Sequence, residues 1–205
     1  MKMSPVRARQ LSGLGLNLAL VWSFQNLTSP APASSNHLRI AQAGPTAAAS
    51  DTARNAESDS DKLLEHYNAG LLHARSKDYA AASEDFRQAA AFDPKDGDSH
   101  FQLGRMLYLL EKHKEAAEQL QSAVTVNKAD AEAYRLLGTV YRSLNKNVDS
   151  VEAYKKAISL APDSTSAHYG LAITYRTMGD SKGFDEQYTI LNRLDPSLAE
   201  QLHGH

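Results

Sequence analysis

Apolar residues follow helical spacing in two runs within each of four consecutive stretches of the chain. Leu103, Leu107 and Leu110 mark one run, and an equivalent apolar run recurs 34 residues later. Spacings of three and four residues place side chains on one face of an α-helix, whereas a strand would alternate them. A short polar break separates the two runs of each stretch, as a tight turn between antiparallel helices requires. The pattern therefore predicts an all-α fold built from helix-turn-helix units.

A period of 34 residues runs through residues 63–198. Pro94, Pro162 and Pro196 differ by multiples of 34, and Lys128 stands at the missing multiple. Two further columns share this period, one of small and one of large residues: Gly70, Gly104, Gly138 and Ala172, and Phe86, Leu120, Tyr154 and Tyr188. A small residue on one helix lets its partner approach closely enough for the large residue to fill the gap. We therefore divide the segment into four repeats, at residues 63–96, 97–130, 131–164 and 165–198.

At these residues the chain resembles the tetratricopeptide-repeat (TPR) family, whose 34-residue motif asks for small, aromatic, Ala and Pro residues at set places. The fourth repeat departs most from that motif, with Ala172, Phe184 and Leu191 where smaller or different residues are usual. The resemblance implies a right-handed α-solenoid of four tandem helix-turn-helix repeats. A terminal cap should cover the exposed end of such a stack. We predict this cap and tail at residues 197–205, with Leu198 and Leu202 on the apolar side of a short capping helix.

The N-terminal part of the chain has the composition of a targeting leader. Residues 1–50 contain no Asp or Glu, and Lys2, Arg7 and Arg9 precede an apolar stretch at residues 11–24. This stretch is too short and too interrupted by Gly, Ser and Asn to span a hydrocarbon core of about 30 Å comfortably, but it fits a signal peptide. Residues 1–33 are therefore predicted to be a signal peptide, which implies a periplasmic or secreted protein. An organellar transit peptide and a disordered tail are the alternatives.

Residues 34–61 are rich in Ala, Ser, Asp, Asn and Gly and hold few large apolar side chains. Such a segment buries too little apolar surface to offset the entropy of ordering. We predict a flexible low-complexity linker between the leader and the repeats.

Composition excludes several classes of function. The net charge is -2, with 22 basic and 24 acidic residues, so no overall field attracts nucleic acid or anionic lipid. We expect the chain to contact a membrane only through the leader. The absence of cysteine excludes thiol catalysis and thiolate metal sites. We find no nucleophile beside a base, no pair of carboxylates and no phosphate-binding loop that the repeat pattern does not already explain. We therefore predict a non-enzymatic protein without a cofactor.

His66, His100 and His168 occupy one equivalent position in three repeats. Equivalent positions on neighbouring packed helices lie roughly 8–10 Å apart. Ligand nitrogens of one zinc ion must lie within about 3–4 Å of each other, since each Zn–N bond is about 2 Å long. We therefore predict no metal site, and interpret these histidines as substitutes for the aromatic residue that Tyr134 provides in the third repeat.

In TPR proteins the first helices of successive repeats line a concave groove that takes peptides. The resemblance maps this groove onto nine residues of the chain: Tyr67, Arg75, Phe101, Arg105, Tyr108, Arg135, Arg142, Tyr169 and Arg176. Arginine binds carboxylates through a planar pair of donors and stacks on aromatic rings. The groove is therefore predicted to bind a segment that is acidic or ends in a free carboxylate. The alternative is that these arginines are solvated surface charges among packing aromatics.

One subgroup of the family grips the acidic C-termini of chaperones through Lys, Asn and Arg residues. This chain does not carry that set at the equivalent positions, which are Tyr67, Leu71, Gln102, Glu132 and Leu136. The predicted function is a scaffold or adaptor that binds a protein or peptide partner. The alternative is an assembly subunit that self-associates through its repeats.

Overall fold

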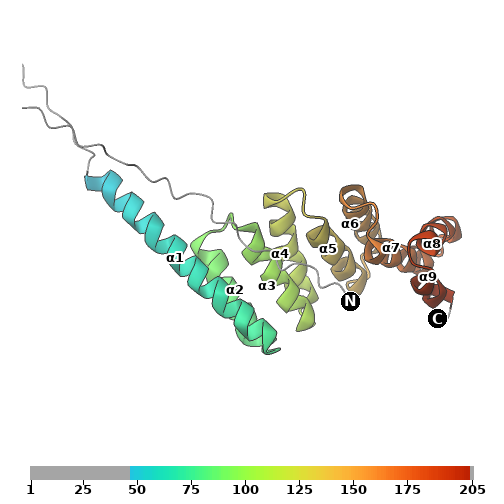
Figure 1. The fold of residues 1–205 in the computed structure, drawn as a ribbon, viewed down its shortest axis with the longest axis horizontal. Helices are drawn as coiled ribbons and strands as arrows, with labels where there is room; N and C mark the ends of the chain where they lie inside the picture. Colours follow the sequence, from blue (N-terminus) through green and yellow to red (C-terminus); the bar gives the residue numbers. More distant parts are fainter. Residues whose placement is uncertain (1–46, 204–205) are drawn as a thin grey trace, which may run out of the picture. The chain divides into compact units, whose positions relative to one another are not determined.

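The computed structural model describes residues 47–203, and within that range the side chains of residues 58–202. The predicted leader, and the linker up to residue 46, lie outside the described residues. Nine α-helices follow one another over the described range (Figure 1). Their bounds are α1 (Ala47–Arg75), α2 (Tyr79–Phe92), α3 (Gly97–Leu109), α4 (His113–Val126), α5 (Ala131–Ser143), α6 (Asn147–Leu160), α7 (Thr165–Met178), α8 (Ser181–Leu194) and α9 (Pro196–His203).

The helices pack as consecutive pairs. The tightest packing is between α1 and α2, α3 and α4, α5 and α6, and α7 and α8, and each pair also contacts the next (Figure 1). The short α9 packs on α7 and α8. The fold class predicted from the sequence, an α-solenoid of helical hairpins, is confirmed. No described helix is both long enough and apolar enough to cross a membrane.

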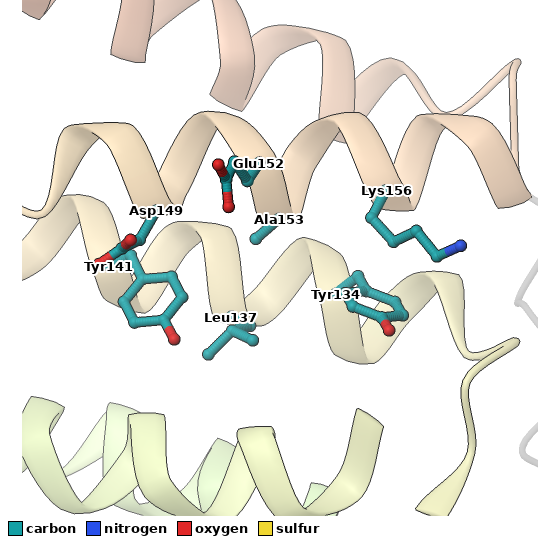
Figure 2. Close-up of a pocket in the computed structure, with 7 residues that line it drawn as sticks. All are labelled: Tyr134, Leu137, Tyr141, Asp149, Glu152, Ala153 and Lys156. Carbon is teal, nitrogen blue, oxygen red and sulfur yellow. The ribbon is translucent and has the colours of Figure 1, made fainter. Parts of the chain in front are cut away.

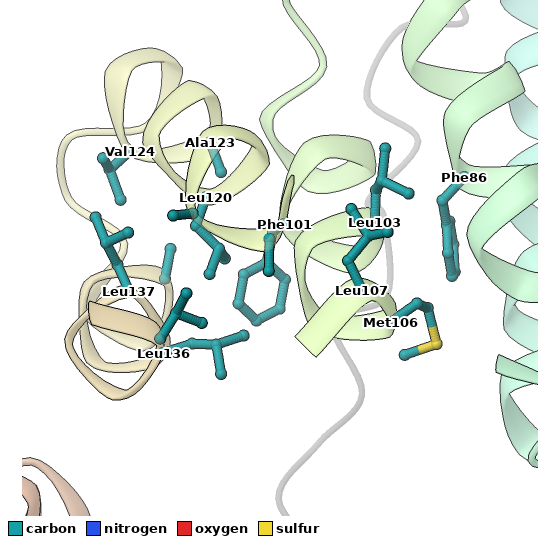
Figure 3. Close-up of a cluster of buried hydrophobic side chains, with 14 of the residues drawn as sticks. Phe86, Phe101, Leu103, Met106, Leu107, Leu120, Ala123, Val124, Leu136 and Leu137 are labelled. Carbon is teal, nitrogen blue, oxygen red and sulfur yellow. The ribbon is translucent and has the colours of Figure 1, made fainter. Parts of the chain in front are cut away.

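The columns of small and large residues meet in the core. A Cβ atom at Gly104 would lie 2.7 Å from Leu120 Cγ, and one at Gly138 would lie 2.9 Å from Tyr154 Cγ. Real Cβ atoms do not approach other atoms this closely, so the first helices of the first three repeats need glycine where the large residue of the partner helix enters, and the fourth has Ala172 there. Figure 3 shows buried side chains of neighbouring helices in one cluster, with Phe101, Leu120 and Leu136 among them.

Each turn between the two helices of a repeat has the same backbone. One residue adopts the left-handed conformation, and the next amide donates to a carbonyl in the last turn of the first helix, for example Lys112 N–H to Leu107 O at 2.9 Å. This arrangement is a Schellman motif, which satisfies carbonyls left unpaired at a helix end. The left-handed residues recur every 34 positions: Lys77, Glu111, Asn145 and Gly179.

The first helix differs from the prediction. It begins at Ala47, so residues 47–61, which the sequence analysis assigns to a flexible linker, are helical. The segment is rich in alanine, which has the highest helix propensity of all residues. It also extends a helix that packing has already nucleated, so the unfavourable nucleation step is avoided. The linker prediction considered only the apolar surface available for burial.

Candidate functional site

The nine residues predicted to line a groove all lie on the first helices of the repeats. We call the surface that they mark the first-helix face. On α3, Phe101, Arg105 and Tyr108 are spaced by four and three residues, so about 100° of rotation per residue brings them to one side of the helix. The other members are Tyr67 and Arg75 on α1, Arg135 and Arg142 on α5, and Tyr169 and Arg176 on α7.

The structure places two of the predicted aromatic anchors in the core. Tyr67 and Phe101 are each only 9% exposed. The Tyr67 ring meets the Phe86 ring edge-on, with centroids 5.5 Å apart. These rings hold first and second helices together, so the prediction that they form an exposed contact surface is corrected. Tyr108 and Tyr169 are half-buried and keep part of their rings accessible.

Two of the five arginines on this face are engaged within the chain. Arg135 donates from Nε to Glu132 Oε2 at 2.8 Å, and its Nη2 donates to the other oxygen of the same carboxylate. This hydrogen-bonded partner raises the pKa of Arg135 above its usual value. Arg176 donates from Nη1 to the carbonyl of Leu202 at 2.6 Å and so ties α7 to the end of α9. Both arginines stabilise the solenoid and are poorly placed to bind a separate anion.

The remaining arginines are available. Arg75 and Arg105 are exposed, and neither has an ion pair within the described part of the chain. Arg142 is half-buried, and its Nε atom is buried without a hydrogen-bond partner among the described residues. Three arginines of the face are therefore available to an anion, and two of them, Arg105 and Arg142, lie on the successive first helices α3 and α5.

Tyr108 shares the first-helix face with both of these arginines. It follows Arg105 by one helical turn on α3, and it occupies the same repeat position as Arg142 on α5. Equivalent positions on neighbouring packed helices are roughly 8–10 Å apart. The Tyr108 ring contacts His113 with centroids 5.5 Å apart, which fixes its orientation from the side of α4. The repeat register thus assigns Arg105, Arg142 and the half-buried Tyr108 to the same face of the solenoid.

The histidine column is held by hydrogen bonds that recur between repeats. His100 bonds through Nδ1 to Gln119 Oε1 at 2.9 Å and through Nε2 to the Pro94 carbonyl at 3.1 Å. In the fourth repeat, His168 makes the same two contacts, to Gln187 Oε1 at 2.7 Å and to the Pro162 carbonyl at 2.9 Å. His66 instead stacks on Phe92, with centroids 5.6 Å apart. These side chains occupy the interhelical place expected for an aromatic residue.

Comparison with known protein families gives the same assignment. A family model described as "Tetratricopeptide repeat" matches residues 67–133, and one described as "TPR repeat" matches residues 138–179. The two matches together take in more than half of the 205 residues. The chain belongs to the tetratricopeptide-repeat family. No curated protein sequence matches this TPR protein.

Several solved TPR structures share the fold. MamA from Desulfovibrio magneticus RS-1 is 27% identical, with a TM-score of 0.63 over 66% of this chain and 76% of MamA. YrrB, described as a TPR protein with an unusual peptide-binding site, is 21% identical, with a TM-score of 0.65 over 76% of this chain and 87% of YrrB. The first TPR of Spaghetti (RPAP3), bound to the HSP90 peptide SRMEEVD, is 19% identical. Its TM-score is 0.57 over 58% of this chain and 94% of the Spaghetti chain.

The sequence analysis considered Gln102 only as a position of the chaperone-binding set and did not predict it to line the groove. Its Oε1 atom is buried and has no hydrogen-bond partner in the part of the chain that the structure describes. The residue lies on α3 beside Phe101, three positions before Arg105. The equivalent residues of the other repeats are unlike it, namely Asn68, Leu136 and Gly170, so the repeat pattern gave no signal.

Proposed function

We propose that this TPR protein is a non-catalytic scaffold whose first-helix face binds an acidic segment of a partner polypeptide. The observation that carries the proposal is the pair of available arginines, Arg105 and Arg142, on the face that also holds the half-buried Tyr108. The fold supports the same class of function, because similar TPR structures carry a peptide-binding site or a bound peptide rich in Glu.

The spacing of these groups suits an extended peptide. Neighbouring first helices lie roughly 8–10 Å apart, and an extended chain advances about 3.3–3.6 Å per residue. Carboxylates roughly three residues apart can therefore each reach one guanidinium, with an apolar or aromatic side chain between them over Tyr108. Charge-assisted hydrogen bonds from arginine are about twice as strong as neutral ones, so these contacts would dominate binding.

Peptide binding to the full chain tests this proposal. The probe is a short fluorescent peptide with one Phe among Glu and Asp residues and a free C-terminus, and binding is measured by anisotropy at several salt concentrations. Reversing both charges, with Arg105→Glu and Arg142→Glu, should weaken binding at least about tenfold, because each close charge pair contributes more than about 1.4 kcal/mol. Binding by the wild type should also weaken as salt is added.

Arg193→Glu is the matched control, since Arg193 is an exposed arginine on α8, outside the first-helix face. A peptide with Lys in place of Glu and Asp is the control for ligand charge. Equal affinity of the doubly reversed variant and the Arg193→Glu variant for the acidic peptide would refute the proposal, as would equal affinity of the wild type for the basic peptide.

We further propose that the protein is exported through the leader at residues 1–33. The support is the acid-free N-terminus with basic residues ahead of an apolar stretch. Fractionation of cells that produce the chain with a C-terminal reporter measures its location and size. A shortened product outside the cytosol is expected, and a full-length cytosolic product would contradict export.

A further inference from the structure

A hollow of about 290 Å³ lies in the third repeat between α5 and α6 (Figure 2). On α5 its residues Tyr134, Leu137 and Tyr141 are spaced by three and four residues and so share one side of the helix. This side is rotated by about 100° or more from Arg135 and Arg142, at about 100° per residue. The hollow is therefore separate from the first-helix face. Its full lining is Tyr134, Leu137, Tyr141, Asp149, Glu152, Ala153 and Lys156.

The hollow exists because the third repeat lacks a side chain that its neighbours have. In the second repeat, Gln119 of α4 reaches across to His100 of α3. Gln187 and His168 make the same bridge in the fourth repeat. At the equivalent positions the third repeat has Ala153 and Tyr134. Alanine cannot form the bridge, so the space over Ala153 stays open and the Tyr134 ring lines it.

The lining is apolar and aromatic at its base and acidic at its rim. Leu137 and Ala153 are buried, and Tyr134 and Tyr141 are half-buried. The Tyr141 hydroxyl accepts a hydrogen bond from Gln121 Nε2 at 2.6 Å, which anchors that ring from α4. The Tyr141 ring already has the Lys146 ammonium at 5.9 Å from its centroid, so the chain itself places a cation against this ring.

The charges are distributed unevenly along the hollow. Asp149 lies beside Tyr141 and Glu152 lies over the middle, whereas Lys156 lies at the Tyr134 end (Figure 2). Both carboxylates are exposed and lack an ion pair among the described residues. An arriving cation therefore meets two carboxylates that have no ion pair among the described residues, with Lys146 against the Tyr141 ring and Lys156 at the Tyr134 end.

We propose that this hollow binds an arginine side chain of a partner polypeptide. The methylene stem packs on Leu137 and Ala153, and the planar guanidinium stacks on a tyrosine ring. The same group donates paired hydrogen bonds to Asp149 or Glu152, which is the geometry that arginine and carboxylate prefer. The long stem also keeps the charged end in contact with water. This site does not depend on the acid-binding function of the first-helix face.

Amide chemical shifts of the full chain test the proposal. The probes are blocked short peptides with a central Arg, Gln or Glu and otherwise identical sequence. The Arg peptide should shift the amides of Ala153, Tyr134 and Tyr141, and the Gln and Glu peptides should not. Asp149→Asn with Glu152→Gln should weaken binding of the Arg peptide at least about tenfold, as loss of a charge-assisted pair requires.

Ala153→Gln is the second variant, because it supplies the side chain that two sister repeats carry at this position and therefore suits the fold. Its thermal unfolding should match that of the wild type, while binding of the Arg peptide is lost. Binding that survives Ala153→Gln, or equal shifts with the Glu peptide, would overturn the site. A dimer seen by light scattering and abolished by Ala153→Gln would place a second copy in the hollow and overturn the assignment to a separate partner.

Discussion

Tyr154 connects two repeats through one buried ring. A Cβ atom at Gly138, in the same repeat, would lie 2.9 Å from its Cγ, and one at Gly170, in the next repeat, would lie 2.4 Å from its Cζ. The Tyr154 hydroxyl also lies within hydrogen-bond distance of Thr139 Oγ1, at 2.9 Å. The repeat pattern predicted Gly138, because glycine recurs there. It could not predict Gly170, because that requirement follows from the size of one particular ring.

The preceding interface solves the same packing problem with different residues. Leu120 and Leu136 stand at the positions of Tyr154 and Gly170, and both are buried in one cluster. The same space is thus filled in two ways. One interface pairs tyrosine with glycine, and the other pairs two leucines. Cores accept such exchanges when the total volume is kept.

We expect Tyr154→Leu and Gly170→Leu each to destabilise the protein. The first leaves a cavity and the second overpacks the core, at a cost of roughly 1–3 kcal/mol each. The double variant copies the Leu120 and Leu136 pair. Its loss in free energy of unfolding should therefore be about 1–3 kcal/mol smaller than the sum of the losses in the two single variants. Urea unfolding of the four proteins measures this coupling free energy. Strict additivity would show that the two positions do not share one space.

Helix ends determine how the last element is attached. Asp195 directly precedes α9 and accepts hydrogen bonds from the Ser197 hydroxyl at 2.6 Å and from the Leu198 amide at 3.1 Å. These two donors, the hydroxyl first, hold the pKa of Asp195 below its ordinary value of 3.8. Pro196 takes the first helical position, where its missing N–H has no cost. An ionised Asp195 therefore stabilises the start of the capping helix.

The stabilisation by Asp195 should depend on pH. Because the pKa is lower in the folded state, the contribution is complete above the ordinary value of 3.8 and is lost as pH falls through the folded value. The free energy of unfolding of the wild type should exceed that of Asp195→Asn at about pH 6, and this difference should shrink below about pH 4. Urea titrations of both proteins across this range measure it. A difference that stays constant with pH would contradict the capping role of the carboxylate.

The sequence predicted the number and order of the repeat helices but not all of their ends. The polar breaks indicated the turns, yet Lys77, Glu111 and Asn145 share no side-chain property that marks the left-handed position. That conformation is imposed by the two helices that the turn must join. The early start of α1 was missed because alanine-rich helix adds stability through the backbone, without the apolar burial that the composition argument considered.

The two ends of the solenoid are finished in different ways. At the N-terminal end, Leu72 of α1 is 64% exposed, whereas the equivalent residues Met106, Val140 and Thr174 are each 0% exposed. Nearby, exposed Glu65 stands where later repeats bury Ser or Ala. At the other end, α9 buries Ala199 and Leu202 against the last hairpin. Terminal repeats of a solenoid usually present a polar outer face. Here α9 covers the C-terminal end, whereas the N-terminal end combines the exposed Glu65 with the uncovered apolar side chain of Leu72.

The sequence predicted which helix faces carry the candidate residues, but not which of those residues are free to bind a ligand. The repeat register identified the helices and sides that carry the arginines. It could not show that Arg135 is bonded to Glu132 or that Arg176 holds the Leu202 carbonyl, since these pairings depend on side-chain conformation and on the docking of α9. The burial of Phe101 likewise results from packing across helices. We therefore propose Arg105, Tyr108 and Arg142 as the centre of the binding face.

Photo-crosslinking tests the central claim most directly, because it locates the bound peptide on the molecule. The acidic peptide carries benzoylphenylalanine in place of its Phe, and mass spectrometry identifies the residues of the full chain to which it attaches. We expect attachment on α3 and α5 around Tyr108, lost with Arg105→Glu and Arg142→Glu and retained with Arg193→Glu. Attachment on the second helices α4, α6 or α8, or attachment unaffected by the charge reversal, would contradict the account.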